Sequence, residues 1–120
     1  MELNEYQKQA MTTCTESSRN FSYMMLNLVG EVGELASKIA KMIRKKEVTI
    51  IDDDLGSGCS FPELCRQDDE MRKEAGDILW QLSGLCSVMG WRLEDIASQN
   101  LEKLASRKKR GVIVGDGDNR

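Results

Sequence analysis

The chain has 120 residues, of which 40% are hydrophobic and 31% charged, and its net charge is −3. This length and balance predict one globular domain with a core of its own, or one shared with a partner subunit. The acidic charge argues against nonspecific nucleic-acid binding, and no apolar run approaches the roughly 18 residues of a membrane span. We therefore expect no nucleic-acid partner and no membrane partner.

The types of side chain present limit the chemistry further. No histidine is present, which excludes histidine-based triads, histidine-ligated zinc and histidine proton shuttles. Any hydrolysis must depend on carboxylates, metal-activated water and cationic side chains. The charged amino terminus lacks a signal-peptide core, and the cysteines have no CxxC spacing, so we expect free thiols in a cytoplasmic protein. The cysteines are Cys14, Cys59, Cys65 and Cys86.

Helical periodicity dominates the first part of the chain, which lacks proline before Pro62. A first helix is predicted from Asn4, as its N-cap, to about Thr15. A second should run from about Phe21 to Arg44, because apolar residues recur there every three or four positions. The positions expected to face inward are Met25, Leu28, Val32, Leu35, Ile39 and Met42.

The segment 45–67 is expected to be an irregular insertion, in which Val48 to Ile51 could form a short strand. Turns and loop are indicated by Asp52-Asp53-Asp54, Gly56-Ser57-Gly58 and Phe61-Pro62. A third helix is predicted from about Asp68 to Met89, closed by Gly90, and a fourth from about Leu93 to Lys108. The positions expected to face inward on these two helices are Met71, Ile78, Leu82, Leu85, Met89, Leu93, Ala97, Leu101 and Leu104.

Together these elements predict an all-α fold, a bundle of about four helices over residues 1–110 followed by a glycine-rich tail at 111–120. A bundle of this size is expected to assemble as an oligomer. The tail lacks the preceding strand and following helix of a phosphate loop. A mobile tail that folds over a ligand is the alternative.

Two short acidic motifs carry the chemistry. Glu31 and Glu34 lie three residues apart with Gly33 between them, and Glu74 and Asp77 repeat the pattern around Gly76. Residues three apart on a helix are surface neighbours, so each motif projects a pair of carboxylates. Two pairs that face each other repel unless a hard cation such as Mg²⁺ binds between them. The alternative is that these acids are solvated helix surface.

Polar flanks and interior glycines give each motif a context. The second helix carries Asn27, Glu31, Glu34 and Lys38 beside its apolar stripe, and the third carries Glu70, Glu74, Asp77 and Gln81 in the same steps. A glycine inside a helix costs about 1 kcal/mol against alanine. Close helix approach, or room for a ligand, would explain the glycines. They are Gly30, Gly33, Gly76 and Gly84.

The fourth helix bears Asn100, Lys103 and Arg107 on one flank. Two cations and an amide at helical spacing suit phosphate oxygens. The alternative is that cations simply favour the carboxyl end of a helix.

These residues resemble the MazG-like all-α nucleoside triphosphate pyrophosphohydrolases. The resemblance depends on three stretches, and it covers most of the chain from Met24 to Gly111. The stretches are Leu28 to Leu35 (LVGEVGEL), Lys73 to Trp80 (KEAGDILW) and Asn100 to Leu104 (NLEKL), the last followed by Arg107 and Gly111. Gly30 stands where many members have a further glutamate, as in the dCTP-pyrophosphatase-like form.

The resemblance implies cleavage of a (d)NTP to the monophosphate and pyrophosphate, for house-cleaning or control of nucleotide pools, by a homodimer or homotetramer. It implies that Mg²⁺, with Mn²⁺ as the alternative, is bound by four acids: Glu31, Glu34, Glu74 and Asp77. Glu34 and Lys103 are the catalytic candidates, for proton transfer and for the leaving group. The substrate-binding candidates are Asn100, Lys103, Arg107, Lys38 and Trp80.

Three alternatives stay open. The chain could be a helical module that binds a nucleotide or a protein partner without catalysis. Within the enzyme class it could be a dUTPase or a phosphoribosyl-ATP pyrophosphatase. The insertion between the acidic motifs is longer than in compact members, so the base is not predicted. Trp80, Trp91, Phe21, Tyr6 and Tyr23 are candidates for stacking on it, with core or subunit interface as the alternative for each.

Overall fold

Four α-helices make up most of the chain, and a two-stranded hairpin joins the second helix to the third. The computed structural model describes residues 1–51, 54–57 and 61–120, and the side chains of 1–47 and 67–120. The predicted all-α fold is confirmed. The elements are α1 (Leu3–Met11), a short 3-10 helix η1 (Glu16–Ser18), α2 (Phe21–Arg44), β1 (Val48–Ile51), β2 (Asp54–Ser57), α3 (Phe61–Val88) and α4 (Leu93–Lys109).

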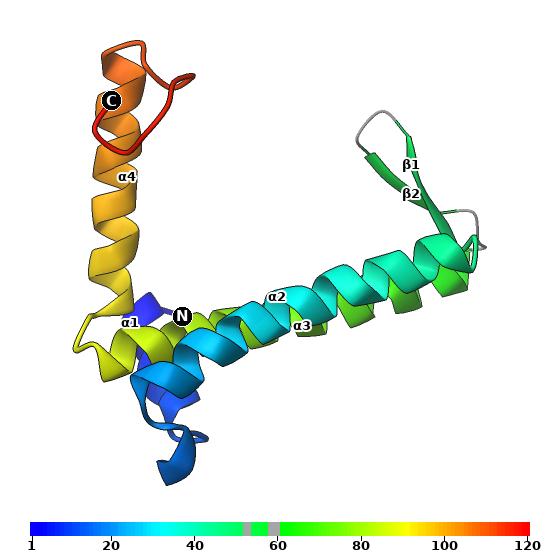
Figure 1. Cartoon of the computed structure of the whole chain (residues 1–120), viewed down its shortest axis with the longest axis horizontal. Helices are drawn as coiled ribbons and strands as arrows, with labels where there is room; N and C mark the ends of the chain where they lie inside the picture. The colour runs from blue at the N-terminus through cyan, green and yellow to red at the C-terminus, as the bar shows by residue number, and fades with distance from the viewer. Residues whose placement is uncertain (52–53, 58–60) are drawn as a thin grey trace.

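The two long helices, α2 and α3, lie side by side and run in opposite directions (Figure 1). The hairpin extends from one end of this pair, and α1 packs near the other end. Helix α4 leaves that second end and projects away from the pair. The radius of gyration is 17.8 Å, whereas a compact domain of this length would have about 14 Å. The chain is therefore less compact than usual for its length, because α4 and the hairpin project from the α2–α3 pair.

Helix α2 has the predicted bounds. Asn20 stands at its N-cap in extended conformation, and its side-chain oxygen accepts a hydrogen bond from the backbone N–H of Tyr23 at 2.8 Å. This bond satisfies one of the amide groups that a helix start leaves without a partner. Beyond Arg44 the backbone turns through Lys46, whose φ is +59°, into β1.

Helix α1 is shorter than predicted, and Asn4 lies inside it rather than at its N-cap. Asn4 instead caps α4: its side-chain oxygen accepts from the backbone N–H of Glu94 at 3.1 Å, and its amide donates to the Glu94 carboxylate at 2.8 Å. Gln7 accepts from the backbone N–H of Leu93 at 2.8 Å. Two side chains of α1 thus supply the caps that α4 lacks from its own N-cap residue, Arg92.

The insertion is more ordered than predicted. The expected strand at Val48–Ile51 is confirmed, and it pairs antiparallel with β2. The expectation of turn and loop was wrong at Asp54 and Gly56-Ser57, which lie in β2. It was also wrong at Phe61-Pro62, because α3 already begins at Phe61. Proline is tolerated in the first turn of a helix, where its missing N–H would have no partner. The rest of the insertion, 52–53 and 58–60, lies outside the described residues.

Gly90 ends α3 as expected, and a second glycine, Gly111, ends α4. Gly90 has φ +72°, and the N–H of Trp91 donates to the carbonyl of Cys86 at 2.8 Å. Gly111 has φ +70°, and the N–H of Val112 donates to the carbonyl of Arg107 at 3.0 Å. The left-handed glycine and the backward bond together form the usual stop of a helix.

The core lies where α2 crosses α3. Met24 is fully buried, and a Cβ on Gly84 would lie 2.4 Å from its sulfur. Close helix approach therefore explains Gly84. It does not explain Gly33 or Gly76, where an added Cβ would meet nothing within 4 Å.

Several positions predicted to face inward are exposed. They are Met25, Val32, Met89, Leu101 and Leu104. Other members of the same faces are buried, such as Met42 and Leu93, each 5% exposed, so the chain covers each face only in part.

Two further expectations concern the class of protein. Cys14 and Cys86 are free thiols, as expected, while the side chains of Cys59 and Cys65 lie outside the described set. None of the helices in the described ranges combines the length and the apolarity needed to cross a bilayer.

Candidate functional site

The polar flanks of α2 and α3 face each other across the helix pair. Asn27 donates to the side-chain oxygen of Gln81 at 2.9 Å, which ties the two flanks together near the core. Farther along, the Lys38 ammonium lies 2.6 Å from a carboxylate oxygen of Glu74. The acidic motifs lie between these two cross-links, so both helices contribute carboxylates to one place.

Three carboxylates meet there: Glu31 from α2, and Glu74 and Asp77 from α3. One oxygen of each lies within 4.8 Å of the others. Oxygens that share one Mg²⁺ lie at most about 4.2 Å apart, because each is about 2.1 Å from the ion. Neighbouring ligands of an octahedral ion are closer still, about 3.0 Å apart, so side-chain movements of about an ångström or more would bring the three onto a common cation.

The surroundings of Glu31 disfavour its ionisation. Burial raises the pKa of Glu31 most, and the charges of Glu34 and Asp77 raise it further. A hydrogen bond from Asn27 at 3.0 Å opposes the shift by favouring the charged form. A bound cation would offset the repulsion that raises this pKa.

Glu74 is the buried member of the cluster, with 6% of its surface exposed. Its Oε1 accepts from Lys38, but its Oε2 is buried and has no hydrogen-bond partner among the described residues. A buried oxygen without a donor costs about 1–3 kcal/mol. A metal ion would satisfy this oxygen, so the donor set fits a hard cation.

Glu34, the fourth predicted acid, lies outside the group of three. Its side chain is exposed, and its charge reaches Glu31 closely enough to raise the pKa of that residue. The first motif therefore divides: Glu31 faces α3, while Glu34 stays at the edge of the cluster, next to solvent.

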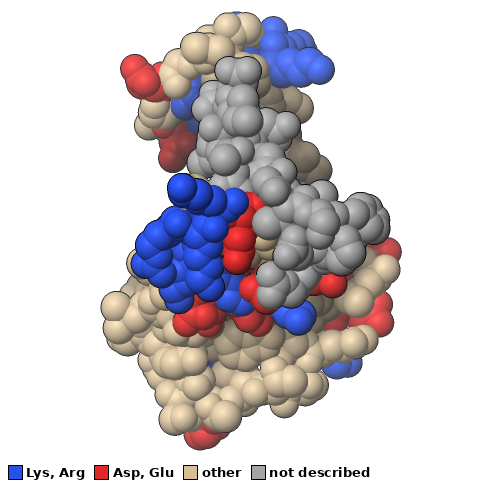
Figure 2. Space-filling view, turned by 90° about the vertical axis from the view of Figure 1, so that its right-hand side faces the viewer, with Lys and Arg blue, Asp and Glu red and all other residues tan. Residues whose placement is uncertain are grey.

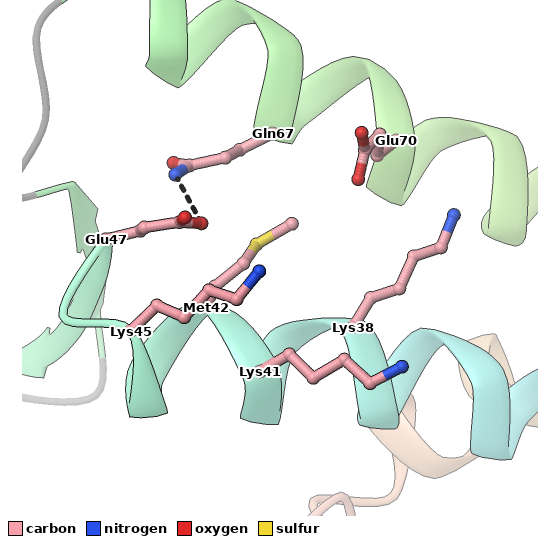
Figure 3. A pocket seen from close by; sticks show the side chains of 7 residues that line it. All are labelled: Lys38, Lys41, Met42, Lys45, Glu47, Gln67 and Glu70. Carbon is pink, nitrogen blue, oxygen red and sulfur yellow. Dashed lines mark hydrogen bonds between the residues drawn. The ribbon is translucent and has the colours of Figure 1, made fainter.

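A cavity of about 180 Å³ adjoins the cluster on the hairpin side. Figure 3 shows Lys38 reaching from α2 toward α3, where Gln67 and Glu70 form the opposite wall. Lys41 and Lys45 continue the α2 wall beyond Lys38. At this end of the helix pair, basic side chains gather beside acidic ones (Figure 2). The cluster thus opens on a polar cavity with three lysines.

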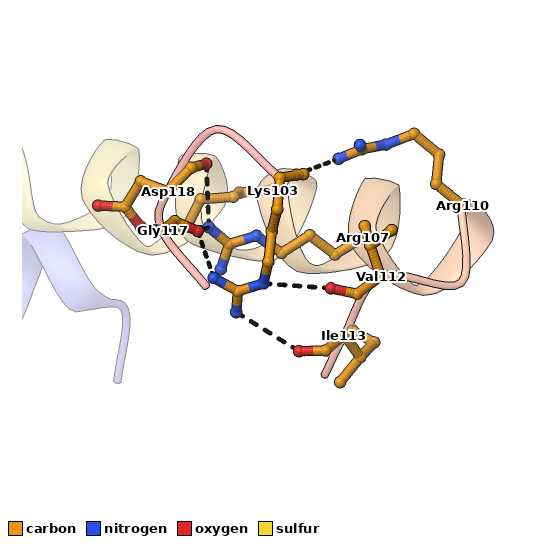
Figure 4. Close-up of polar contacts among 8 residues, drawn as sticks. Lys103, Arg107, Arg110, Val112, Ile113, Gly117 and Asp118 are labelled. Carbon is orange, nitrogen blue, oxygen red and sulfur yellow. Dashed lines mark hydrogen bonds and ion pairs between the residues drawn. The ribbon is translucent and has the colours of Figure 1, made fainter. Parts of the chain in front are cut away.

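The predicted phosphate-binding residues of α4 lie elsewhere. Asn100 and Lys103 are exposed on the half of α4 that projects away from the helix pair (Figure 1). Arg107 is 5% exposed, because residues 111–120 fold back over it. Both cations contact Asp118 of that tail (Figure 4). Within one chain, the structure does not bring these residues to the carboxylates.

Two of the aromatic candidates, Trp80 on α3 and Tyr6 on α1, belong to helices that pack against each other. The indole N–H of Trp80 donates to the Ala10 carbonyl at 3.1 Å and to the Thr13 hydroxyl at 2.9 Å, so Trp80 anchors α3 on α1. Burial, and then the charge of Asp77, raise the pKa of Tyr6. Tyr6 is therefore the aromatic candidate that lies within electrostatic reach of the cluster. Stacking of either side chain on a base stays a prediction.

The match to known families agrees with this arrangement. A family model described as the MazG nucleotide pyrophosphohydrolase domain matches residues 19–112. The chain belongs to the MazG family. The MazG match begins just before α2 and ends just after α4, so it includes both acidic motifs and the cations of α4.

A relative of this MazG protein is the "Gene 37 protein" of Mycobacterium phage L5. The two are 36% identical over 105 residues, which cover 88% of this chain and 81% of the phage protein. The name of the phage protein specifies no substrate. No solved structure matches the chain.

Some residues of this MazG site could not be assigned from the sequence. Asn27 and Gln81 were placed on the polar flanks, but their bond to each other required the structure. Asp118 lies beyond the MazG match, in a segment without periodicity, and no sequence signal pointed to it.

Proposed function

We propose that this MazG protein is a magnesium-dependent nucleoside triphosphate pyrophosphohydrolase, which cleaves a (d)NTP to the (d)NMP and pyrophosphate. The observation that carries the proposal is the three-carboxylate cluster with its buried oxygen, Glu74 Oε2, that has no hydrogen-bond donor among the described residues. Such a cluster is costly unless it holds a cation. Phosphate-bearing substrates commonly bring Mg²⁺ to carboxylates of this kind.

In this proposal Glu31, Glu74 and Asp77 hold Mg²⁺, with Mn²⁺ as the alternative. The metal would supply neutralisation of the triphosphate and a lowered pKa for the attacking water. Glu34 completes the set from the edge of the cluster. Because it is the acid least engaged with the others, we assign it to take the proton of the water that attacks the α-phosphorus.

Cationic side chains would hold the phosphate chain and stabilise the charge on the departing pyrophosphate. Lys38 is already at the cluster, through its contact with Glu74. Lys103 and Arg107, with Asn100, belong to α4 and reach no carboxylate of the cluster in their own chain. They would complete the site from a second copy.

The surface of the chain supports an assembly. Its accessible area is 8717 Å², whereas a compact monomer of 13.5 kDa would expose about 6,500 Å². Leu101, 67% exposed, and Leu104, 43% exposed, lie on the projecting helix. We propose a homodimer or homotetramer in which a second copy covers this face of α4.

The cellular role we propose is house-cleaning or control of nucleotide pools in the cytoplasm, without a nucleic-acid or membrane partner. The free thiols of Cys14 and Cys86 support a reducing compartment. The net charge of −3 supports the absence of a nucleic-acid partner.

A substrate panel tests the reaction. The purified protein is incubated with each common NTP and dNTP and with Mg²⁺ or Mn²⁺, and the products are separated. Glu31→Ala and Asp77→Ala are run beside Asp69→Ala, an exposed aspartate on α3 outside the cluster. We expect monophosphate and pyrophosphate from the wild type and from Asp69→Ala, and neither product from the two cluster variants.

Other products would change the conclusion. Diphosphate with phosphate would mean attack at another phosphorus. Activity that survives both cluster variants would remove the carboxylates from the mechanism. Absence of turnover with every nucleotide would favour a non-catalytic binding module.

A further inference from the structure

Residues 111–120 form a closed loop over the end of α4 (Figure 4). The Arg120 guanidinium donates to the carbonyls of Val112 at 3.1 Å and Ile113 at 3.4 Å, and also to that of Gly117. Arg110 in turn donates to the Arg120 carbonyl at 2.7 Å. These bonds hold the loop in one place rather than leaving it extended.

The loop presents one carboxylate to the two cations of α4. An oxygen of Asp118 lies 3.1 Å from Nη2 of Arg107 and 3.5 Å from Nζ of Lys103. Arg107 Nη2 also donates to the backbone carbonyl of Asp118 at 3.0 Å. The Lys103 and Arg107 side chains, one turn apart on α4, thus share a single anion from their own chain.

This arrangement leaves Arg107 incompletely bonded. A guanidinium offers Nε and Nη2 along one edge, and an oxyanion with suitably spaced oxygens engages both. Asp118 engages Nη2 with its Oδ1, while Nε of Arg107 is buried and has no hydrogen-bond partner among the described residues. A phosphate group, with three oxygens and more negative charge, could use both nitrogens and Lys103 together.

We propose that the loop at Gly117 and Asp118 is a built-in substitute for a phosphate group, which competes with the substrate for Lys103 and Arg107. The proposal rests on the proposed function for its assignment of phosphates to these cations. The contact is suited to displacement, because Asp118 is 85% exposed and ion pairs with an exposed member are weak. The loop therefore lowers the affinity for phosphate without blocking the site.

The backbone of Gly117 sets the position of the carboxylate. Its φ of +79° is a conformation that residues with a Cβ rarely adopt. Its carbonyl accepts from Arg107 at 3.5 Å and from Arg120. Gly117→Ala should therefore disturb the presentation of Asp118 while leaving every charge in place.

The experiment measures binding of inorganic pyrophosphate to the full chain by calorimetry, without turnover. We expect Asp118→Asn to bind pyrophosphate about two- to fivefold more tightly than the wild type. The substitution removes the ion pairs that compete for the two cations, and these pairs are weak because Asp118 is exposed. Gly117→Ala should change the affinity in the same direction. Arg107→Gln should weaken binding.

Asp116→Asn is the matched control, because it removes the same charge two residues earlier in the same loop. Its affinity should equal that of the wild type. Equal tightening in Asp116→Asn and Asp118→Asn would mean general charge repulsion and would overturn the proposal. Unchanged or weaker binding by Asp118→Asn would also overturn it, since the loop would then be structural or would close over the anion. Melting curves confirm that each variant is folded.

The two proposals fail separately. If the wild type hydrolyses nucleotides but Asp118→Asn binds pyrophosphate no more tightly, only the competing loop is wrong. If Asp118→Asn binds more tightly but no nucleotide is hydrolysed, the loop competes at an anion site and the enzymatic function is wrong. If pyrophosphate binds to neither protein, the cations do not take phosphate and the competing loop is wrong.

Discussion

Side chains of like charge lie together in two places of the protein, and the two places differ in how completely the chain pairs them. Between α2 and α3, three carboxylates meet, and a buried oxygen of Glu74 has no donor within the described residues. At the end of α4, Lys103 and Arg107 meet, and the chain supplies its own counter-charge, Asp118. Lys38 pairs with one oxygen of Glu74 and leaves the other without a donor, whereas Asp118 pairs with both cations of the basic region. In the proposed function, the two regions are halves of one site that lie apart within a single chain.

The largest effect is expected from mixing two inactive variants. Asp77→Ala removes a carboxylate and Arg107→Gln removes a cation, so neither homo-oligomer should turn over substrate. If α4 of one chain serves the cluster of another, a mixed dimer contains one intact site. Co-expressed, separately tagged chains purified for both tags, or simple mixtures after refolding, should regain activity, in a simple mixture roughly a quarter of the wild-type value.

The control for this experiment pairs two variants from the same region. Glu31→Ala with Asp77→Ala damages every cluster in every combination, so no activity should return. If Asp77→Ala with Arg107→Gln also fails to recover, the acids and cations act within one chain, and α4 must move to reach the cluster.

A smaller effect is expected from removal of one charge at the cluster. The raised pKa of Glu31 means that the folded protein binds this proton more tightly than the unfolded chain. Its stabilisation is complete at low pH and is lost as the pH rises through the raised pKa. Without metal, the wild type should lose stability over that rise, and Glu31→Gln, which can keep the Asn27 bond, should lose less.

Magnesium should stabilise the wild type more than Glu31→Gln. At about one hundred times its dissociation constant, a bound ion stabilises a protein by about 2.7 kcal/mol. Melting temperatures with and without Mg²⁺ should therefore rise for the wild type and for Asp69→Asn, and rise much less for Glu31→Gln. An equal rise in all three would mean that the ion binds elsewhere.

The smallest effect is expected at the basic region. Arg107 most strongly, and then Lys103, hold the pKa of Asp118 below its usual value of 3.8. A lowered pKa gives stabilisation that is present above the usual value and is lost as the pH falls through the lowered one. Amide signals of Gly117 and Asp118 should shift in NMR spectra as the pH falls below 3.8 and through the lowered pKa of Asp118. In Asp118→Asn this shift should be absent, whereas a shift at higher pH would assign the change to another group.

Local periodicity explains what the sequence could predict. Glu31 and the pair Glu74 and Asp77 follow from three-residue spacing, and the matching polar flanks of α2 and α3 predicted that they face each other. The same periodicity marked Leu101 as apolar, but an apolar face does not say which molecule covers it. Spacing therefore predicted the acidic region better than the surroundings of α4.

Contacts through space set the limit of prediction. Asn4 was assigned as a cap from its residue type, yet it caps α4 rather than α1, because a side chain can reach a neighbouring helix. The pairing of Asp118 depends on a loop whose path is set by Gly117 and Arg120, in a segment without repeating pattern. The start of α3 was missed because Phe61-Pro62 is compatible with both a loop and a first helical turn.

The caps that α1 provides for α4 have a consequence for handling the protein. Asn4 and Gln7 accept hydrogen bonds from the first two backbone N–H groups of α4. The short helix α1 therefore fixes the angle between α4 and the α2–α3 pair. A small change of this angle at the start of α4 becomes a larger displacement at Arg107, because Arg107 lies in the last turn of the helix. Fusion tags and truncations near Leu3 would thus change the direction in which α4 projects from the α2–α3 pair.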